Sequence, residues 1–327
     1  MAKQIKSDEK ENAPLEVLAP KRQLAPVVFA SPHSGNNYPP DFVTASPLDI
    51  LSLRKSEDSF VDALFSAAPD LGMPLLRALF PRAYIDPNRE PFELDPMMFE
   101  DTLPDYANTQ SSRVKAGLGT IARLVSSGHE IYGEKLWFKE AAARINTNYR
   151  PYHRQLRELL DQTRQTFGCY LLVDCHSMPS VGGPHDPDAG RRRADIVLGD
   201  CFASTCDNKI ISVVEDVFSE YGYQVTRNRP FAGGFSTKHY GNPKLGLHAL
   251  QIEINRALYM DETVIKKNIS YSANAKRGSK RNPYLKEDDL ISVKNSFFGK
   301  TSGVLQEVTA PFVGIYSTQQ LIKGFSD

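Results

Sequence analysis

Two apolar segments of strand length each lead to a histidine, and this pattern constrains the fold of the chain more than any other. Residues 27–30 (Val-Val-Phe-Ala) precede His33, and residues 170–173 (Tyr-Leu-Leu-Val) precede His176. Apolar runs of this length predict buried strands. Ligands bind at the carboxyl ends of strands in an α/β sheet, so we expect the two histidines to belong to one metal site or one catalytic site.

The rest of the chain alternates between strand-like and helix-like segments, which predicts a three-layer α/β/α fold with a central, mostly parallel or mixed sheet. The expected strands are residues 27–30, 74–80, 169–174, 194–198, 222–226 and 247–254, and the expected helices are residues 46–68, 132–166 and 204–221. We expect the first helix to break near Lys55, with Ser56 as the N-cap of its second part. We expect the second helix to break or kink at Pro151. Two irregular segments, residues 81–109 and 228–246, are long enough to be functional.

Charge and hydropathy limit the classes of protein that the chain can belong to. Its 39 Lys and Arg residues balance 39 Asp and Glu residues, so no overall field attracts it to nucleic acid or to a membrane surface. It has no apolar stretch of the roughly 18 residues that a membrane-spanning helix needs. Residues 1–25 lack the apolar core of a signal peptide. We therefore expect a cytoplasmic protein, a monomer or small homo-oligomer, whose partner is a small-molecule substrate.

Domain organisation follows from the same scan of the sequence. Residues 1–25 are interpreted as a flexible arm or a short leading strand, and residues 26–327 as one catalytic domain, because no linker composition interrupts them. The basic segment 270–288 is interpreted as a mobile surface loop. The four cysteines are expected to be reduced thiols.

The two strand-end histidines match the donors of a hydrolytic zinc site, which takes three protein ligands and keeps one position for water. The third ligand is expected from a carboxylate at the start of the helix that follows the first strand, either Asp58 or Glu57. In the simpler alternative, Asp58 only stabilises the helix N-terminus through its charge. Asp174 precedes His176 by two residues, so both side chains point to one face of a strand and Asp174 can orient the imidazole.

Glu253 lies at the end of an almost wholly apolar strand, where an ionised carboxylate is costly unless it is paired or functional. One interpretation makes it the general base that takes a proton from a metal-activated water. The other makes it half of a buried salt bridge with Arg256 or another arginine.

Substrate-binding residues are expected in the two irregular segments. Arg89, next to Asn88 in a proline-bounded loop, is suited to pair with a substrate carboxylate through two parallel hydrogen bonds or to polarise a carbonyl group. The alternative is a solvated arginine. Arg256 is a second candidate for the carboxylate. The Gly233-Gly234 pair and Tyr240 are expected to form a backbone-lined substrate loop.

Taken together, these motifs resemble the N-formylglutamate amidohydrolase family. The matching segments are Ser31-Pro-His33-Ser-Gly35, Asp86-Pro-Asn-Arg89, Tyr149-Arg-Pro-Tyr152-His153, Asp174-Cys-His176-Ser, Pro230-Phe-Ala-Gly-Gly234 and Gln251-Ile-Glu253-Ile-Asn-Arg256. Their order and spacing fit from residue 25 to residue 265. The resemblance implies a zinc-dependent hydrolase of the zinc-exopeptidase type, related in fold to the metallocarboxypeptidases and to deacylases such as aspartoacylase.

The resemblance also implies an activity and assigns roles to residues. Members of the family hydrolyse N-formyl-L-glutamate to formate and L-glutamate, late in histidine degradation. Carried over to this sequence, His33, Asp58 and His176 bind one zinc ion per chain, or another divalent metal. Glu253 becomes the catalytic glutamate, and Arg89 binds or polarises the substrate. Two alternatives stay open, namely a zinc peptidase or amidase that acts on short peptides and an inactive member that binds a small carboxylate.

Overall fold

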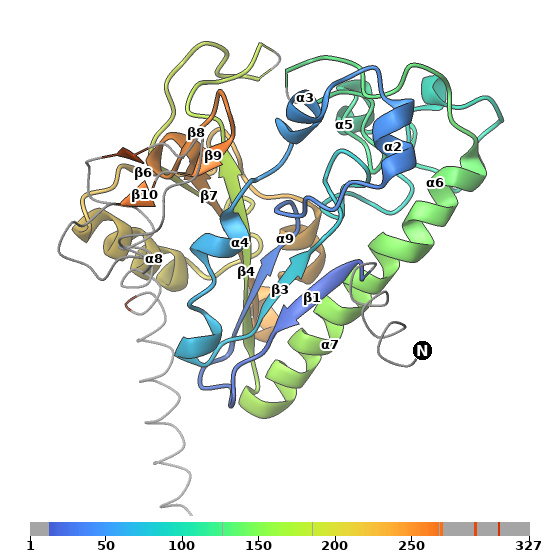
Figure 1. Cartoon of the computed structure of the whole chain (residues 1–327). Coiled ribbons are helices and arrows are strands. Elements are labelled where there is room, and N and C mark those ends of the chain that lie inside the picture. The colour runs from blue at the N-terminus through green and yellow to red at the C-terminus, as the bar shows by residue number, and fades with distance from the viewer. Residues whose placement is uncertain are drawn as a thin grey trace, which may run out of the picture.

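A mixed β-sheet with helices on both faces forms the centre of the molecule (Figure 1). The computed structural model describes residues 13–125, 127–184, 186–267, 269–270, 291–292 and 307. Most of the basic segment predicted to be a surface loop, residues 271–288, lies outside this part of the chain. None of the helices in the described part is long and apolar enough to cross a membrane.

The sheet places the expected strands next to one another, and its strand order is β1-β3-β2-β4-β7-β5-β6. The strands are β1 (Leu15–Leu18), β2 (Val27–Ser31), β3 (Leu75–Ala78), β4 (Tyr170–Met178), β5 (Ile196–Gly199), β6 (Val225–Arg227) and β7 (Leu247–Asn255). Strands β3, β2, β4 and β7 run parallel, whereas β1 is antiparallel to β3 and β5 is antiparallel to β7. The prediction of a mixed α/β sheet is confirmed. Within the predicted arm, β1 is the leading strand that we gave as an alternative.

Alternation along the strands divides the core into two halves. Val27 and Phe29 of β2 face one cluster of buried apolar side chains, and Val28 and Ala30 face the other. This two-sided burial explains why the strand reads as a continuous apolar run. Two helices, α4 (Val61–Leu64) and α8 (Asn208–Glu220), cover the first face. The second face is covered by α6 (Phe138–Arg144), α7 (Arg150–Phe167) and α9 (Phe235–Tyr240) (Figure 1). The sheet and the helices on its two faces make the three layers that the sequence predicts.

The helices lie in the connections between the strands of the sheet. They are α2 (Pro40–Ala45), α3 (Ile50–Arg54), α4 (Val61–Leu64), α5 (Ser112–Lys115), α6 (Phe138–Arg144), α7 (Arg150–Phe167), α8 (Asn208–Glu220) and α9 (Phe235–Tyr240). Short 3₁₀ turns occupy Pro69–Leu71, Pro96–Met98, Pro243–Leu245 and Arg256–Leu258, and small strand pairs are β8 (Met260–Asp261) with β9 (Lys266–Lys267) and β10 (Ile269–Ser270) with β11 (Ile291–Ser292).

One expectation about the helices is confirmed and three are wrong. The predicted helix 46–68 breaks near Lys55 as expected, since α3 ends at Arg54 with Lys55 as its C-cap. Ser56 is not the N-cap of the second part, because α4 begins after Phe60, whose left-handed backbone (φ 68°) separates it from Ser56. The predicted break at Pro151 is instead one π turn at Ile145–Tyr149, with the proline in the first turn of α7, where a missing N–H is tolerated. Segment 228–246 contains α9, which at six residues is too short to show a helical period.

Candidate active site

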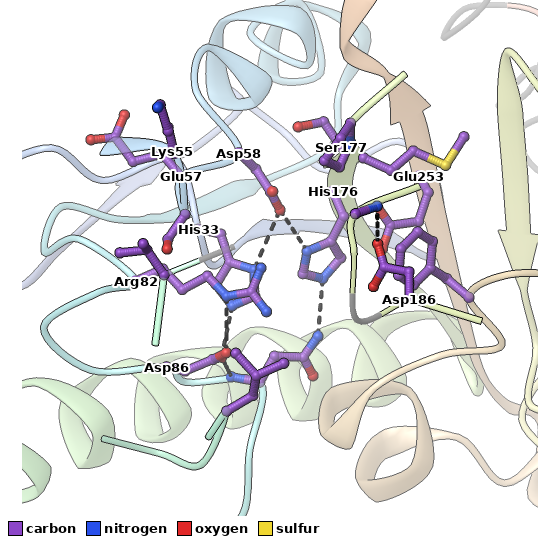
Figure 2. A pocket seen from close by; sticks show the side chains of 18 of the residues that line it. His33, Lys55, Glu57, Asp58, Arg82, Asp86, His176, Ser177, Asp186 and Glu253 are labelled. Atoms are coloured by element: carbon purple, nitrogen blue, oxygen red, sulfur yellow. Dashed lines mark hydrogen bonds and ion pairs between the residues drawn. The ribbon is translucent and has the colours of Figure 1, made fainter. Parts of the chain in front are cut away.

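His33, Asp58 and His176 converge at the carboxyl edge of the sheet. Each is buried, and one ligand atom from each lies within 4.8 Å of the others. Asp58 Oδ2 lies 2.9 Å from His176 Nδ1 and 3.3 Å from His33 Nδ1 (Figure 2). The neighbouring Glu57 turns away, because its carboxylate accepts hydrogen bonds from Arg54 and from Ser59 at 2.7 Å. Of the two carboxylates considered from the sequence, Asp58 therefore completes the group.

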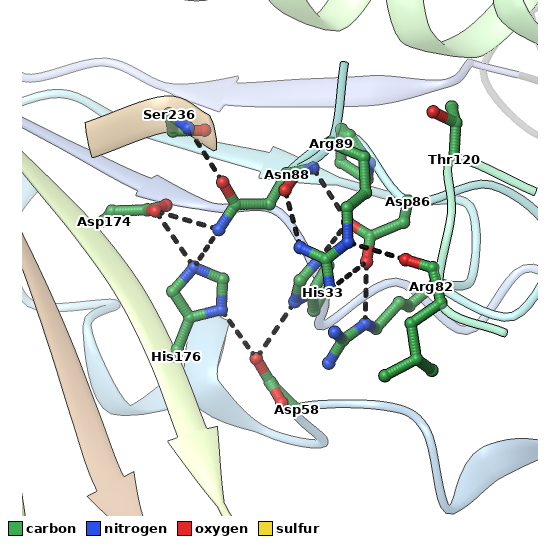
Figure 3. A network of polar contacts seen from close by, with 12 residues as sticks. His33, Asp58, Arg82, Asp86, Asn88, Arg89, Thr120, Asp174, His176 and Ser236 are labelled. Atoms are coloured by element: carbon green, nitrogen blue, oxygen red, sulfur yellow. Dashed lines mark hydrogen bonds and ion pairs between the residues drawn. The ribbon is translucent and has the colours of Figure 1, made fainter. Parts of the chain in front are cut away.

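The outer nitrogen of each imidazole faces a second carboxylate. His33 Nε2 lies 2.7 Å from Asp86 Oδ1, and His176 Nε2 lies 3.0 Å from Asp174 Oδ2 (Figure 3). A neutral imidazole has one N–H, and when Nε2 donates it, Nδ1 presents a lone pair. The Nδ1 lone pairs of both rings would then meet an oxygen of Asp58, an arrangement that a cation between them satisfies. The donors and their supporting carboxylates thus fit a metal site.

The electrostatics of Asp58 and His176 point the same way. Burial opposes charge on Asp58, but the hydrogen bonds and charges of His176 and His33 outweigh it and hold the pKa of Asp58 well below its usual range. Burial likewise opposes a charged His176, yet Asp174 and Asp58 hold the pKa of that imidazole well above its usual range. The protein environment therefore favours a positive charge between these carboxylates, which either a proton or a metal ion supplies.

Glu253 stands beside this group because β7 pairs in register with β4. Glu253 is opposite His176 in the ladder and is 7% exposed. Burial raises the pKa of Glu253 to about 7, a value suited to taking up and releasing a proton at neutral pH. Gln251 Nε2 donates to its Oε1 at 2.7 Å.

The alternative salt bridge of Glu253 is not seen. Among the described residues, no arginine or lysine lies within ion-pairing distance of the Glu253 carboxylate, and Arg256 Nη2 donates instead to Asp58 Oδ1 at 3.0 Å. Arg256 also lines the cavity described below, where it was expected as a second carboxylate partner.

Arg89 and Asn88 line the cavity described below, and both side chains already make hydrogen bonds within the protein. Arg89 Nε donates to the Leu118 carbonyl at 2.8 Å, and its Nη1 donates to the Asn88 carbonyl at 2.7 Å. Burial lowers the pKa of Arg89 to about 10, so the side chain stays charged at neutral pH. Asn88 Nδ2 donates to Asp174 Oδ2 at 3.2 Å and lies 3.0 Å from His176 Nε2, and Asn88 Oδ1 accepts the Ser236 N–H at 2.8 Å (Figure 3). Asn88 therefore holds the carboxylate that faces His176.

A cavity of about 710 Å³ opens over the group, within the range of small-molecule sites. The Gly233-Gly234 pair lines it, and a Cβ on Gly234 would lie 2.5 Å from the Asn88 amide. Tyr240 is not among the residues of the cavity wall. Its ring is buried in the core on the α7 side, with its hydroxyl 2.8 Å from His153 Nδ1. This placement argues against the substrate-binding role expected for Tyr240.

Among the cavity residues that the sequence analysis did not name as site residues are Asp86, Arg82 and Arg113. Arg82 Nε donates to Asp86 Oδ2 at 3.0 Å. Arg82 therefore fixes the carboxylate that contacts His33. The Asp86-Pro-Asn-Arg89 motif was the available signal for Asp86. An arginine such as Arg113 in a polar segment gives no periodic signal at all.

A sheet edge with a buried His-Asp-His group beside an unpaired carboxylate has the make-up of a metal-dependent hydrolase site. Residues 25–260 match the family model described as N-formylglutamate amidohydrolase. The chain belongs to this family, as the motifs in the sequence indicated.

Similar proteins and solved structures lead to the same family. The chain is 31% identical over 249 residues to N-formylglutamate deformylase from Pseudomonas putida and 30% identical over 250 residues to that from Pseudomonas aeruginosa; each match covers 76% of this chain and 86% of the relative. The crystal structure of N-formylglutamate amidohydrolase from Ralstonia eutropha superposes with a TM-score of 0.77 at 33% identity, covering 94% of this chain and 99% of that one. A gene product of Agrobacterium tumefaciens shares the fold, with a TM-score of 0.62 at 18% identity over 94% of this chain and 97% of that one.

Proposed function

We propose that the protein hydrolyses the amide bond of N-formyl-L-glutamate and releases formate and L-glutamate. The observation that carries the proposal is the buried His33–Asp58–His176 group with Glu253 in register beside it. The names of the two Pseudomonas relatives and of the Ralstonia structure support the choice of substrate.

The donor set selects the metal that we propose. Two imidazoles and one carboxylate are ligands that zinc takes in hydrolytic sites. When bound, the ion lowers the pKa of a water molecule and polarises the formyl carbonyl group. Asp86 and Asp174 orient the two imidazoles, whose Nδ1 atoms would hold the ion together with Asp58.

Proton transfer belongs to Glu253 in this proposal. Its carboxylate takes a proton from the attacking water as the new C–O bond forms at the formyl carbon. The same proton then passes to the amide nitrogen as the C–N bond breaks, so that glutamate leaves as the amine and formate as the acid. Arg89 holds the substrate α-carboxylate through the guanidinium N–H groups that remain beyond its two backbone bonds.

The test combines metal analysis with an assay of formate release. Chelator-treated protein is reloaded with zinc, its metal content is measured, and formate released from N-formyl-L-glutamate is followed. We expect one zinc per chain and turnover that depends on it. The His176→Ala variant should lose both metal and turnover. Fully metal-loaded protein that releases no formate contradicts the proposed reaction, and full metal occupancy in the variant contradicts the site.

A further inference from the structure

The arginines that line the cavity differ in whether a carboxylate neutralises them. Six arginines line it: Arg54, Arg82, Arg89, Arg113, Arg193 and Arg256. Five of them lie within 4.0 Å of a carboxylate oxygen. The pairs are Arg54 with Glu57, Arg82 and Arg89 with Asp86, Arg193 with Asp186 and Asp188, and Arg256 with Asp58. Within the part of the chain that the structure describes, Arg113 has no carboxylate at that distance. Arg113 is therefore the one arginine of the cavity whose charge no carboxylate of the described residues neutralises.

Arg113 is held on the same wall as Arg89. The Leu118 N–H donates to the Arg113 carbonyl at 2.8 Å, and the Leu118 carbonyl accepts from Arg89 Nε at 2.8 Å. Ser111 caps the short helix that carries Arg113, because its Oγ accepts the Val114 N–H at 3.0 Å. Leu118 thus links the backbone of Arg113 to the side chain of Arg89 through two hydrogen bonds.

The charge of Arg113 acts on Arg89, and the two side chains differ in exposure. Burial is the main cause that lowers the pKa of Arg89, and the positive charge of Arg113 lowers it further. Arg89 is buried and lies 3.6 Å from Asp86, which contacts His33, whereas Arg113 is exposed. The wall therefore presents one cation next to the candidate metal group and a second cation farther towards solvent.

We infer that Arg113 is a specificity-determining residue that pairs with the side-chain carboxylate of an acidic N-acyl amino acid, while Arg89 holds the α-carboxylate. This inference rests on the proposed function and names the class of substrate that the site selects. The α-carboxylate shares a carbon with the scissile nitrogen, so it lies close to the metal group. The second carboxylate of a glutamate lies two methylene groups farther on, where the outer cation stands. A planar guanidinium group is suited to bind that carboxylate through two hydrogen bonds.

The test compares a charged substrate with its neutral isostere. The values of kcat/KM for N-formyl-L-glutamate and N-formyl-L-glutamine are measured for the parent protein and for Arg113→Met, which keeps a long side chain without charge. We expect the parent to prefer the glutamate substrate. The variant should lose roughly 10- to 100-fold on that substrate, the range of one charged hydrogen-bonded contact, with little change on the glutamine substrate. Arg113→Lys should recover part of the preference as a point charge.

Matched controls separate a specific contact from the general field of the cavity. Lys115 is exposed on the same helix and does not line the cavity, so Lys115→Met removes a nearby charge without touching the proposed contact. Lys238 lines the cavity from α9, and Lys238→Met removes a cation from another wall. An equal loss of preference in either control overturns the inference, as does an unchanged ratio in Arg113→Met. A parent that hydrolyses both substrates equally also overturns it but leaves the proposed function standing, whereas a parent that hydrolyses neither defeats the proposed function itself.

Discussion

At the scale of single residues, the site separates two carboxylates by their surroundings. Asp58 lies beside two imidazoles, which hold its pKa well below the usual range despite burial, and it accepts a hydrogen bond from the Arg256 guanidinium group. Glu253 is buried with one hydrogen bond from Gln251, and its pKa is raised to about 7. Two carboxylates whose pKa values are driven apart can serve as a permanent ligand and as a proton carrier.

The role of Glu253 is tested by Glu253→Gln, which keeps the volume of the side chain and removes its ability to take a proton. We expect kcat to fall by roughly 10²- to 10⁴-fold, the usual contribution of a general base, with zinc content unchanged. Glu262→Gln is a matched control, since Glu262 lines the same cavity but accepts the Ser180 N–H. A near-normal rate in Glu253→Gln, measured by formate release, would show that the carboxylate is structural.

Sequence reasoning at this scale succeeded where a residue follows a strong local pattern. His33 and His176 follow apolar strands, and the topology of parallel strands brings such ends together. The choice between Asp58 and Glu57 depends on the direction of two adjacent side chains, which no spacing defines. Among the described residues, Arg113 has no carboxylate partner, whereas the other cavity arginines do. These pairs form only in the folded molecule, so the sequence does not indicate them.

At the scale of elements, side chains at and just before the start of α7 contact backbone carbonyl groups of the Asp86–Arg89 loop. Tyr149, at the end of the π turn, donates from its hydroxyl to the Arg89 carbonyl at 2.7 Å. His153, one turn later, has its Nε2 2.8 Å from the Pro87 carbonyl. Single π turns inside helices are common at functional sites, and this one brings two side chains to the loop that holds the candidate site. These contacts give a role to the Tyr149-to-His153 motif, whose sequence alone indicated only the family.

The His153 contact predicts a pH dependence of stability. Burial lowers the pKa of His153 to about 4 against an ordinary value of 6.5. Between these values the unfolded chain binds a proton that the folded chain does not, so this contribution to stability is present above pH 6.5 and is lost as the pH falls towards 4. His153→Gln keeps an amide donor for Pro87 and does not titrate. Urea unfolding of metal-free parent and variant should show a steeper acid loss in the parent, by at most about 1.4 kcal/mol per pH unit. Parallel curves for the two proteins contradict the assignment.

Prediction at this scale was best for long elements. The strands β2, β4 and β7 were found from their apolar runs, and the helices α7 and α8 were found as long helix-forming segments. Helix α9 was missed, although its Ser236 N–H holds Asn88 in the site. It begins after the Gly233-Gly234 pair and has too few residues for a periodic pattern, so local sequence favours a loop there.

At the scale of the whole molecule, layering was predictable and strand order was not. Alternating strands and helices dictate a covered sheet, because each element has to bury its apolar face. The position of β5 between β7 and β6, antiparallel to β7, depends on pairing between residues far apart in the chain. The order that results puts β2, β4 and β7 side by side, so that His33, His176 and Glu253 meet from three distant parts of the sequence.

Because the three residues of the candidate metal group come from such distant segments, an ion that binds them would stabilise the complete fold. The unfolded chain does not hold His33, Asp58 and His176 together, so binding favours the native state by RT ln(1 + [L]/Kd), or about 2.7 kcal/mol at a hundredfold excess over Kd. For a chain of this size we expect a rise in Tm of several degrees when zinc is added to chelator-stripped protein. Calorimetry or thermal fluorescence measures the shift, and its size should grow with the free zinc concentration. His176→Ala should unfold at one temperature with or without zinc. A parent Tm that zinc does not change, or an equal rise in the variant, would place the binding of metal elsewhere than in this group.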